Sequence, residues 1–248
     1  MNNQIKHCFE RYEKKYFLTP EQYRMFKEKL SPFIKADDYP TYTLCNIYYD
    51  TDDYRLIRAS IEKPIYKEKL RVRSYGVPKA DSKVFVELKK KYDKVVYKRR
   101  ITATPLFADT LLKGINPVQQ STQITKEIEY FRQFYDVKPK VFIAYDREAY
   151  QGVDNSELRI TFDTNMRYRL DNLNLRAGDY GEPIIDTDNI LMEIKIPGAC
   201  PLWLSKLLNE FKIYPVSFSK YGQCYKEHIL KKNRTIFSKE ARLSAWKH

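Results

Sequence analysis

The sequence predicts an α+β protein in which antiparallel strands close into a barrel, with helices at its flanks and at its C-terminal end. Apolar and charged residues alternate in several short segments, as they do in strands with one face on a core. Tyrosine, with 21 of 248 residues, is abundant and favours half-buried strand surfaces. Because eight such strands would leave exposed edges in an open sheet, a closed barrel is the expected arrangement.

The N-terminal quarter alternates strands and helices. A first strand is predicted over residues 8–18. Thr19-Pro20-Glu21-Gln22 then supplies an N-cap, a proline at the first helical position and a glutamine at the third, and so starts a helix that ends near Leu30. A strand over 42–50 and a short helix over 53–61 follow.

The middle of the chain predicts a meander and two helices. The three strands of the meander cover 66–76, 83–91 and 94–101, with turn signals at Gly76-Val77-Pro78 and at Tyr92-Asp93. The elements predicted after it are helices over 104–113 and 123–135 and strands over 139–150, 157–164 and 189–196.

The C-terminal part ends in helices. The polar stretch Asp171–Asn189 is predicted to be a long surface loop. Helices are expected from Pro201 to about Phe211 and from Lys220 to Lys231, and the last dozen basic residues are expected to fray. The chain has no repeat, low-complexity tract or Pro/Gly-rich linker, so residues 1–248 are interpreted as a single domain.

Composition limits the possible functions. The net charge of +13 attracts phosphates, nucleic acid or anionic membranes. No export signal and no apolar run of about 20 residues is visible, so a cytoplasmic protein without a membrane span is predicted. The cysteines lie far apart and are expected to be reduced: Cys8, Cys45, Cys200 and Cys224. No glycine-rich phosphate loop and no zinc-ligand spacing occurs, so a phosphate would have to be held by Lys and Arg side chains.

Six predicted strands carry charge on one face. Such alternation is ordinarily that of a sheet with one face in water. Here, however, the charged positions of these strands, counted together with Lys98 and Arg100 of the predicted strand 94–101, are ten basic to four acidic, whereas the whole chain has 45 to 32. Arginine, whose planar fork binds two phosphate oxygens, outnumbers lysine at the charged positions of three of the segments given below. The segments are Arg11-x-Glu13-x-Lys15, Arg71-x-Arg73, Glu87-x-Lys89, Tyr145-x-Arg147, Arg159-x-Thr161-x-Asp163 and Glu193-x-Lys195. If the faces converge, they form a basic cavity whose carboxylates suit Mg²⁺ or Mn²⁺.

Eight motifs occur in an order that resembles a known family. They are Arg11-Tyr12-Glu13-Lys14-Lys15-Tyr16, Leu70-Arg71-Val72-Arg73-Ser74-Tyr75-Gly76, Val86-Glu87-Leu88-Lys89, Tyr97-Lys98-Arg99-Arg100, Tyr145-Asp146-Arg147, Leu158-Arg159-Ile160-Thr161-Phe162-Asp163-Thr164, Met192-Glu193-Ile194-Lys195 and Phe218-Ser219-Lys220-Tyr221. Together they resemble the catalytic domain of the vacuolar transporter chaperone (VTC) family. That family is the polyphosphate polymerase branch of the triphosphate tunnel (CYTH-like) metalloenzymes. The resemblance covers Phe9 to about Tyr225.

The resemblance implies an eight-stranded antiparallel tunnel barrel that binds ATP or another triphosphate, inorganic polyphosphate, and Mn²⁺ or Mg²⁺. The phosphate-binding residues it implies are Lys15, Arg71, Arg73, Lys89, Lys98, Arg100, Tyr145, Arg147, Arg159, Ser219 and Lys220. The catalytic residues it implies are Arg71, Arg73, Arg147, Arg159 and Glu193. Glu193 is expected to hold the metal, with Glu13 and Glu87 as further candidates. No DNA partner is expected, and a membrane partner stays unidentified.

Three functions remain open at this point. The hydrolytic branch of the superfamily usually opens with Glu-x-Glu-x-Lys, whereas Arg11 holds the first of those positions here, which favours phosphoryl transfer to polyphosphate. Ser217 stands where the family pattern expects a basic residue. Hydrolysis of triphosphate or polyphosphate in the same tunnel is the first alternative. The second is a non-catalytic module that binds polyphosphate or RNA on a basic, tyrosine-rich face.

Overall fold

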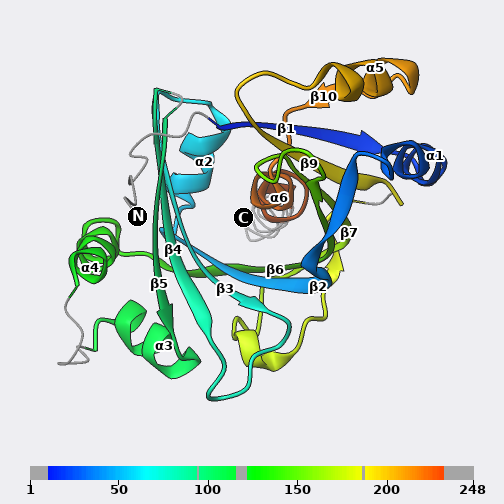
Figure 1. Cartoon of the computed structure of the whole chain (residues 1–248). Helices are drawn as coiled ribbons and strands as arrows, with labels where there is room; N and C mark the ends of the chain where they lie inside the picture. The colour runs from blue at the N-terminus through cyan, green and yellow to red at the C-terminus, as the bar shows by residue number, and fades with distance from the viewer. Residues whose placement is uncertain (1–10, 94, 116–121, 186–187, 232–248) are drawn as a thin grey trace, which may run out of the picture. The chain divides into compact units, whose positions relative to one another are not determined.

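The first helix begins where its sequence signals predict. The computed structural model describes residues 11–93, 95–115, 122–185 and 188–231 (Figure 1). At the start of α1 (Pro20–Leu30), Thr19 Oγ1 accepts a hydrogen bond from Gln22 N at 3.1 Å, and Gln22 Oε1 accepts one from Thr19 N at 3.0 Å. These bonds satisfy backbone donors that have no partner within the helix. Residues 8–10 of the predicted first strand lie outside the described residues.

Eight strands of eight or more residues are present among the described residues, as predicted. They are β1 (Arg11–Leu18), β2 (Ile34–Asp50), β3 (Tyr66–Tyr75), β4 (Val84–Tyr92), β5 (Val95–Ala103), β6 (Lys138–Gly152), β7 (Arg159–Arg169) and β9 (Ile190–Pro197). Two short strands, β8 (Glu182–Pro183) and β10 (Pro215–Val216), pair antiparallel with β7 and β1. The α+β class with antiparallel strands is therefore confirmed.

The helices also follow the prediction. After α1 they are α2 (Arg55–Ile61), α3 (Pro105–Lys113), α4 (Gln123–Tyr135), α5 (Leu202–Glu210) and α6 (Lys220–Cys224). A π-helical turn, Tyr225–Ile229, continues α6, and the predicted loop contains a 3₁₀ turn at Leu175–Ala177 in addition to β8. None of the described helices is both long and apolar enough to cross a membrane.

The chain divides into two compact units, and β2, β6 and β7 contribute residues to both. Of the described residues, unit 1 comprises those within 11–44, 145–165 and 188–218, and unit 2 comprises those within 45–144, 166–185 and 219–231. The hydrogen-bonded strand order is β10-β1-β9-β7-β6-β2 in unit 1 and β7-β6-β2-β3-β4-β5 in unit 2. Among the described residues neither order returns to its first strand, so closure of the sheet by hydrogen bonds is not observed. The single domain over 1–248 stays a prediction.

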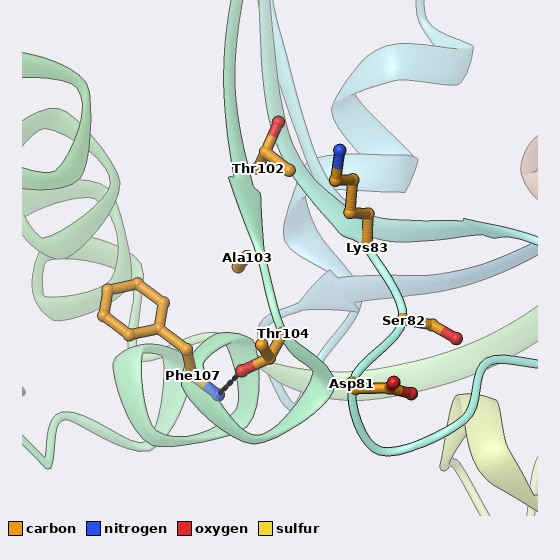
Figure 2. Close-up of a pocket in the computed structure, with 7 residues that line it drawn as sticks. All are labelled: Asp81, Ser82, Lys83, Thr102, Ala103, Thr104 and Phe107. Carbon is orange, nitrogen blue, oxygen red and sulfur yellow. Dashed lines mark hydrogen bonds between the residues drawn. The ribbon is translucent and has the colours of Figure 1, made fainter.

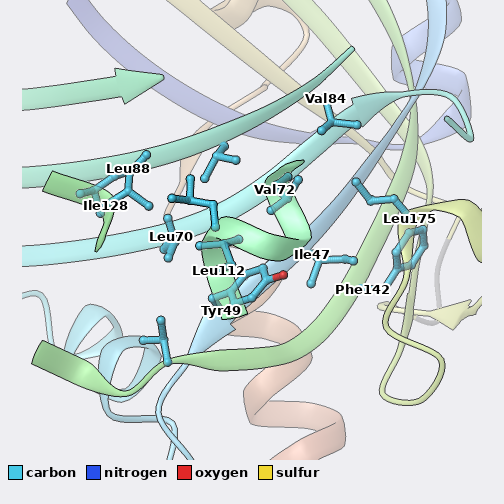
Figure 3. Packing of buried hydrophobic residues seen from close by; sticks show 14 of the residues in the cluster. Ile47, Tyr49, Leu70, Val72, Val84, Leu88, Leu112, Ile128, Phe142 and Leu175 are labelled. Carbon is cyan, nitrogen blue, oxygen red and sulfur yellow. The ribbon is translucent and has the colours of Figure 1, made fainter. Parts of the chain in front are cut away.

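In unit 2, helices cover one face of the β3–β4–β5 sheet. Leu70 and Val72 of β3 and Leu88 of β4 are buried against Leu112 of α3 and Ile128 of α4 (Figure 3). Burying such side chains stabilises the unit by roughly 1.5–3 kcal/mol each before entropy is counted. Since side chains alternate between the faces of a strand, the opposite face is left to the charged residues.

In unit 1, the strands pack against α1 and α5. Leu18 of β1, Phe162 of β7 and Met192 of β9 are fully buried, together with Phe26 of α1 and Leu204 of α5. The charged positions between these apolar residues therefore point to the other face of the unit 1 sheet.

Candidate functional site

A strongly basic sheet face lies in unit 2. Strand register places Arg71 opposite Glu87 and Glu87 opposite Arg100, with Lys89 opposite Lys98 in the next row. We call this side the basic face. Its cations are Lys67, Lys69, Arg71, Arg73, Lys89, Lys91, Lys98 and Arg100, and Glu87 is the carboxylate among them. Such a face favours polyanions over neutral ligands.

Glu87 is the centre of a four-residue cluster, the Glu87 cluster, formed with Arg71, Lys98 and Arg100. Arg71 Nε donates to Glu87 Oε2 at 2.8 Å, and Arg100 Nε donates to Glu87 Oε1 at 2.7 Å. Lys98 Nζ lies 2.8 Å from Glu87 Oε1. The carboxylate is 2% exposed, so these charge-assisted bonds hold three cationic side chains in fixed positions.

Charge sets the ionisation of this cluster. Burial alone raises the pKa of Glu87, but the positive charges of Arg71, Arg73 and Lys98 outweigh it and hold the pKa well below the usual 4.5. Burial lowers the pKa of Lys98, and the charges of Arg100 and Arg71 lower it further against the opposing effect of Glu87. A cation held beside other cations gains from a bound anion, so this cluster is suited to phosphate.

This arrangement makes acid stability depend on Glu87. The pKa of Glu87 is lower in the folded chain than in the unfolded one. Its contribution to the free energy of unfolding is therefore complete above about pH 4.5 and is lost as the pH falls below that value. The Glu87→Gln variant is expected to unfold at lower urea concentration than wild type at pH 7, and the difference is expected to shrink towards pH 3. Urea denaturation at both pH values measures this. A difference that stays constant with pH would contradict it.

Arg73, Ser219 and Lys220 lie in the same unit. Buried Arg73 donates from Nε to Asn46 Oδ1 at 2.8 Å, and Asn46 Nδ2 donates to the carbonyl oxygen of Ile143 at 3.1 Å. Ser219 accepts from Lys69 Nζ at 3.2 Å, and Lys220 beside it is 8% exposed. The hydrogen bond that Arg73 donates to the neutral Asn46 side chain thus orients the guanidinium. Lys89 lies exposed on the basic face.

A second charged cluster lies in unit 1, and we call it the Glu193 cluster: Glu13, Lys15, Arg147, Asp163 and Glu193. Arg147 donates to both oxygens of Asp163, at 2.6 and 2.7 Å, and to Glu193 Oε2 at 3.3 Å. Lys15 Nζ lies 3.5 Å from Glu193 Oε1 and 3.6 Å from Glu13 Oε1. Three carboxylates and two cations therefore meet where β1, β9, β7 and β6 run side by side.

Two more expected residues flank this cluster. The Arg147 guanidinium lies over the ring of buried Tyr145, 5.2 Å from its centre. Arg159 forms an ion pair with Asp37 at the start of β2 and is opposite Lys195 in the strand register. Unit 1 thus brings Glu13, Lys15, Tyr145, Arg147 and Glu193 together. Convergence of the two clusters on one lumen stays a prediction.

The Glu193 cluster has the donor chemistry that a divalent metal ion needs. Glu13 and Glu193 offer carboxylate oxygens, and Thr161, which is opposite Glu193 in the register, has a buried hydroxyl oxygen without a hydrogen-bond partner. Hard oxygen ligands suit Mg²⁺ and Mn²⁺. In the described ranges no group of three or more His, Cys, Asp or Glu side chains is placed to hold a metal ion by itself, and the three carboxylates of this cluster are engaged by Lys15 and Arg147. Glu87 as a ligand stays a prediction, and its oxygens already accept from three cations.

Several residues of the basic face were not among the sequence candidates. Lys67 and Lys69 continue the alternation of Arg71 and Arg73 towards the start of β3, and Lys91 continues that of β4. This signal was visible in the sequence, because the same period of two extends through Lys67-x-Lys69-x-Arg71-x-Arg73. Tyr48, whose hydroxyl accepts from Arg71 Nη1 at 3.2 Å, carried no such signal.

A shallow pocket of about 370 Å³ lies elsewhere in unit 2, between the start of β4, the end of β5 and the start of α3 (Figure 2). Its charged lining residues are Asp81 and Lys83, whose charges cancel. Thr104 Oγ1 accepts from Phe107 N at 3.2 Å and so caps α3. Thr104 thus serves the fold, and the lining of this pocket has no excess of positive charge that would attract a phosphate.

Comparisons with known proteins extend these observations. The chain is 25% identical over 221 residues to vacuolar transporter chaperone complex subunit 4 of Schizosaccharomyces pombe, covering 72% of this chain and 30% of that protein. It is also 25% identical to the subunit 4 of Trypanosoma brucei brucei over 241 residues, 82% of this chain and 30% of that one. The chain therefore spans less than a third of the length of these curated relatives.

Solved structures share the fold. A putative adenylate cyclase from Bacillus halodurans superposes with a TM-score of 0.52 at 14% identity, covering 84% of this chain and 92% of that one. A putative adenylyl cyclase from Hippeastrum, described as having a dominant triphosphatase activity, gives a TM-score of 0.52 at 17% identity with the same coverage. At this identity the likeness shows the fold alone. The family is shown by sequence: the VTC domain model matches residues 10–229, and the chain belongs to the VTC domain family.

Proposed function

We propose that the chain transfers a phosphoryl group from ATP to a growing inorganic polyphosphate chain, with Mn²⁺ or Mg²⁺ as cofactor. The observation that carries the proposal is the basic face of unit 2, where eight cations share one sheet face with the buried carboxylate of Glu87 and three of them contact it. Membership of the VTC domain family supports it. The single domain and the cytoplasmic location accompany it as predictions.

The side chains of unit 2 would bind and align the phosphates. The transferred group passes through a loose transition state with charge on its peripheral oxygens, so rate enhancement comes from positioning and electrostatics. Arg71, Lys98 and Arg100 are held by Glu87, and Arg73 is held by Asn46. Their positive charges are therefore in place before the substrate arrives, and no reorganisation is needed during the reaction.

The side chains of unit 1 would bind phosphate and hold the metal. Lys15 and Arg147 supply positive charge, and Glu193 and Glu13 would be the metal ligands. The ion would supply charge neutralisation for phosphate oxygens when bound. The terminal phosphate of the polyphosphate would attack the γ-phosphorus of ATP, and ADP would leave. Because that phosphate is already ionised, a strong general base is not required.

The product distinguishes this proposal from its alternatives. Incubation of the chain with ATP and Mn²⁺ is expected to yield a ladder of long polyphosphates on a stained gel, and EDTA is expected to abolish it. Release of orthophosphate without formation of polyphosphate would show that the chain hydrolyses its substrate and does not polymerise it. Absence of turnover, with polyphosphate affinity retained in wild type and in Glu193→Gln, would leave a binding module.

A further inference from the structure

Tyr48 of β2 is a buried phenol in unit 2 that is surrounded by cations. Its side chain is 8% exposed, and its ring stacks on that of Tyr221 of α6 at 5.0 Å between ring centres. Its hydroxyl oxygen accepts a hydrogen bond from Arg71 Nη1 at 3.2 Å. The Arg71 guanidinium carbon lies 5.9 Å from the centre of its ring. Tyr48 therefore contacts a cation that belongs to the Glu87 cluster.

The hydroxyl group of Tyr48 uses its acceptor side but not its donor side among the described residues. A phenol both donates and accepts, and Arg71 already uses the acceptor side. Within the described part of the chain, no protein group accepts a hydrogen bond from the Tyr48 hydroxyl. By contrast, the hydroxyl of Tyr221 donates to Asp50 Oδ2 at 2.9 Å. A buried donor beside several cations is suited to an anionic acceptor.

The electrostatics of the neighbourhood agree with this geometry. Burial alone raises the pKa of Tyr48, but the charges of Arg71, Arg73 and Lys69, together with the hydrogen bond from Arg71, lower it to about 8. The other groups near it are Tyr221, whose pKa is raised by burial and by Asp50, and Glu87, which lies on the far side of Arg71. The phenol is thus neutral at pH 7 and mostly ionised at pH 9.

We propose that Tyr48 is a phosphate-binding residue of the basic face, donating its hydroxyl proton to a phosphate oxygen of the bound triphosphate or polyphosphate. The inference rests on the proposed function and adds a substrate contact to it. In the ionised form the same oxygen is an anion, which pairs with the Arg71 guanidinium and repels the phosphate ligand. Binding above pH 8 therefore requires Tyr48 to take up a proton from solvent, and affinity falls as the pH rises through the pKa of Tyr48.

The test is binding of inorganic tripolyphosphate to the whole chain by calorimetry at pH 7, 8 and 9. Replacing Tyr48 with phenylalanine keeps the ring against Tyr221 and removes the hydroxyl. At pH 7 Tyr48→Phe is expected to bind about tenfold or more weakly, because a hydrogen bond to a charged acceptor is lost. From pH 7 to 9 wild type is expected to lose about tenfold in affinity relative to Tyr48→Phe, in which the phenol cannot ionise. Tyr48→Phe and wild type bind the same ligand through the same lysines. Ionisation of the ligand and of the lysines therefore affects both affinities equally and drops out of their ratio.

Tyr49 provides the matched control. It is the next residue, points to the other face of β2 and lies in the apolar cluster of unit 2 (Figure 3). Tyr49→Phe is therefore expected to keep the affinity and pH dependence of wild type. Tyrosinate absorbance near 295 nm should show a group titrating near pH 8 in wild type and in Tyr49→Phe, absent from Tyr48→Phe.

The outcomes separate the two proposals. If wild type and Tyr48→Phe bind tripolyphosphate equally with the same pH profile, Tyr48 is not a phosphate ligand and the proposed function stands. If wild type does not bind tripolyphosphate at any of the three pH values, both proposals fall. A tyrosinate titration near pH 8 that persists in Tyr48→Phe would also overturn the inference.

Discussion

Replacing Arg147 with methionine is expected to lower the free energy of unfolding by about 3–5 kcal/mol at neutral pH. Methionine keeps most of the aliphatic stem but removes both hydrogen bonds to Asp163. The Asp163 carboxylate, 0% exposed, would then be a buried charge without its main partner. A loss of this size is a large part of the roughly 5–15 kcal/mol that holds a typical domain folded.

Urea denaturation measures this loss, and two further variants support the interpretation. The exposed pair Lys113–Asp109 on α3, at 2.7 Å, is the control: Asp109→Ala is expected to cost no more than about 0.5 kcal/mol. The double variant Arg147→Met/Asp163→Leu, which removes both charges, is expected to regain most of the stability. That recovery can be tested even if Arg147→Met does not fold. A single-variant loss within about 1 kcal/mol of zero would show that the buried pair is not a main support of unit 1.

The Arg73→Ala variant is expected to reduce ATP turnover at least 100-fold, about the effect of removing one donor that stabilises transition-state charge. Arg73 is buried and is oriented by Asn46, so its charge is fixed before the phosphate arrives. The variant is expected to fold, because the Asn46 side chain retains its bond to the Ile143 carbonyl. Turnover is measured with ATP and Mn²⁺ at saturating concentrations.

Two companion variants show whether the effect belongs to the phosphate site. Arg73→Lys keeps the charge but loses the planar fork, so an intermediate loss of about tenfold is expected. Arg99 lies on the opposite face of β5, where its Nε donates to Glu127 Oε2 at 3.1 Å, and Arg99→Ala is expected to keep wild-type turnover. Near-normal turnover in Arg73→Ala would remove Arg73 from the site.

The parts of the fold that local chemistry determines could be predicted from the sequence. The capping box at Thr19 and Gln22 specified the start of α1 to the residue. Alternation placed Arg71, Glu87 and Arg100 on one face, and the observed register brings them into contact. A period of two is sufficient for such a prediction, because it fixes the face whatever the neighbouring strand is.

The start of β2 was predicted too late because tertiary contacts overrode local signals. Asp37-Asp38-Tyr39-Pro40 contains residues typical of turns, so the strand was expected from 42. It begins at Ile34, and Asp37 in this early segment pairs with Arg159 of β7. Arg159, which pairs with Asp37, lies more than a hundred positions away in the sequence, so no local pattern predicts this contact.

The contacts of Tyr48 could not be predicted for a similar reason. Tyrosine is common in this chain, and nothing distinguishes Tyr48 from Tyr49 in the sequence. Only the pairing of strands and the position of α6 place one beside Arg71 and Tyr221 and the other in the apolar cluster. Ionisable residues without formal charge at neutral pH are therefore the ones that charge patterning overlooks.

The contacts of Glu87 with both neighbouring strands restrict how this sheet can change length during evolution. Inserting one residue within β5 would exchange its two sides, so that Arg99 and Ile101 face Glu87 while Lys98 and Arg100 are driven against α3 and α4. Insertions inside these strands are therefore tolerated in even numbers, whereas turns accept any number. Alignments of related chains should show gaps of two within β4 and β5, and single-residue gaps confined to their ends.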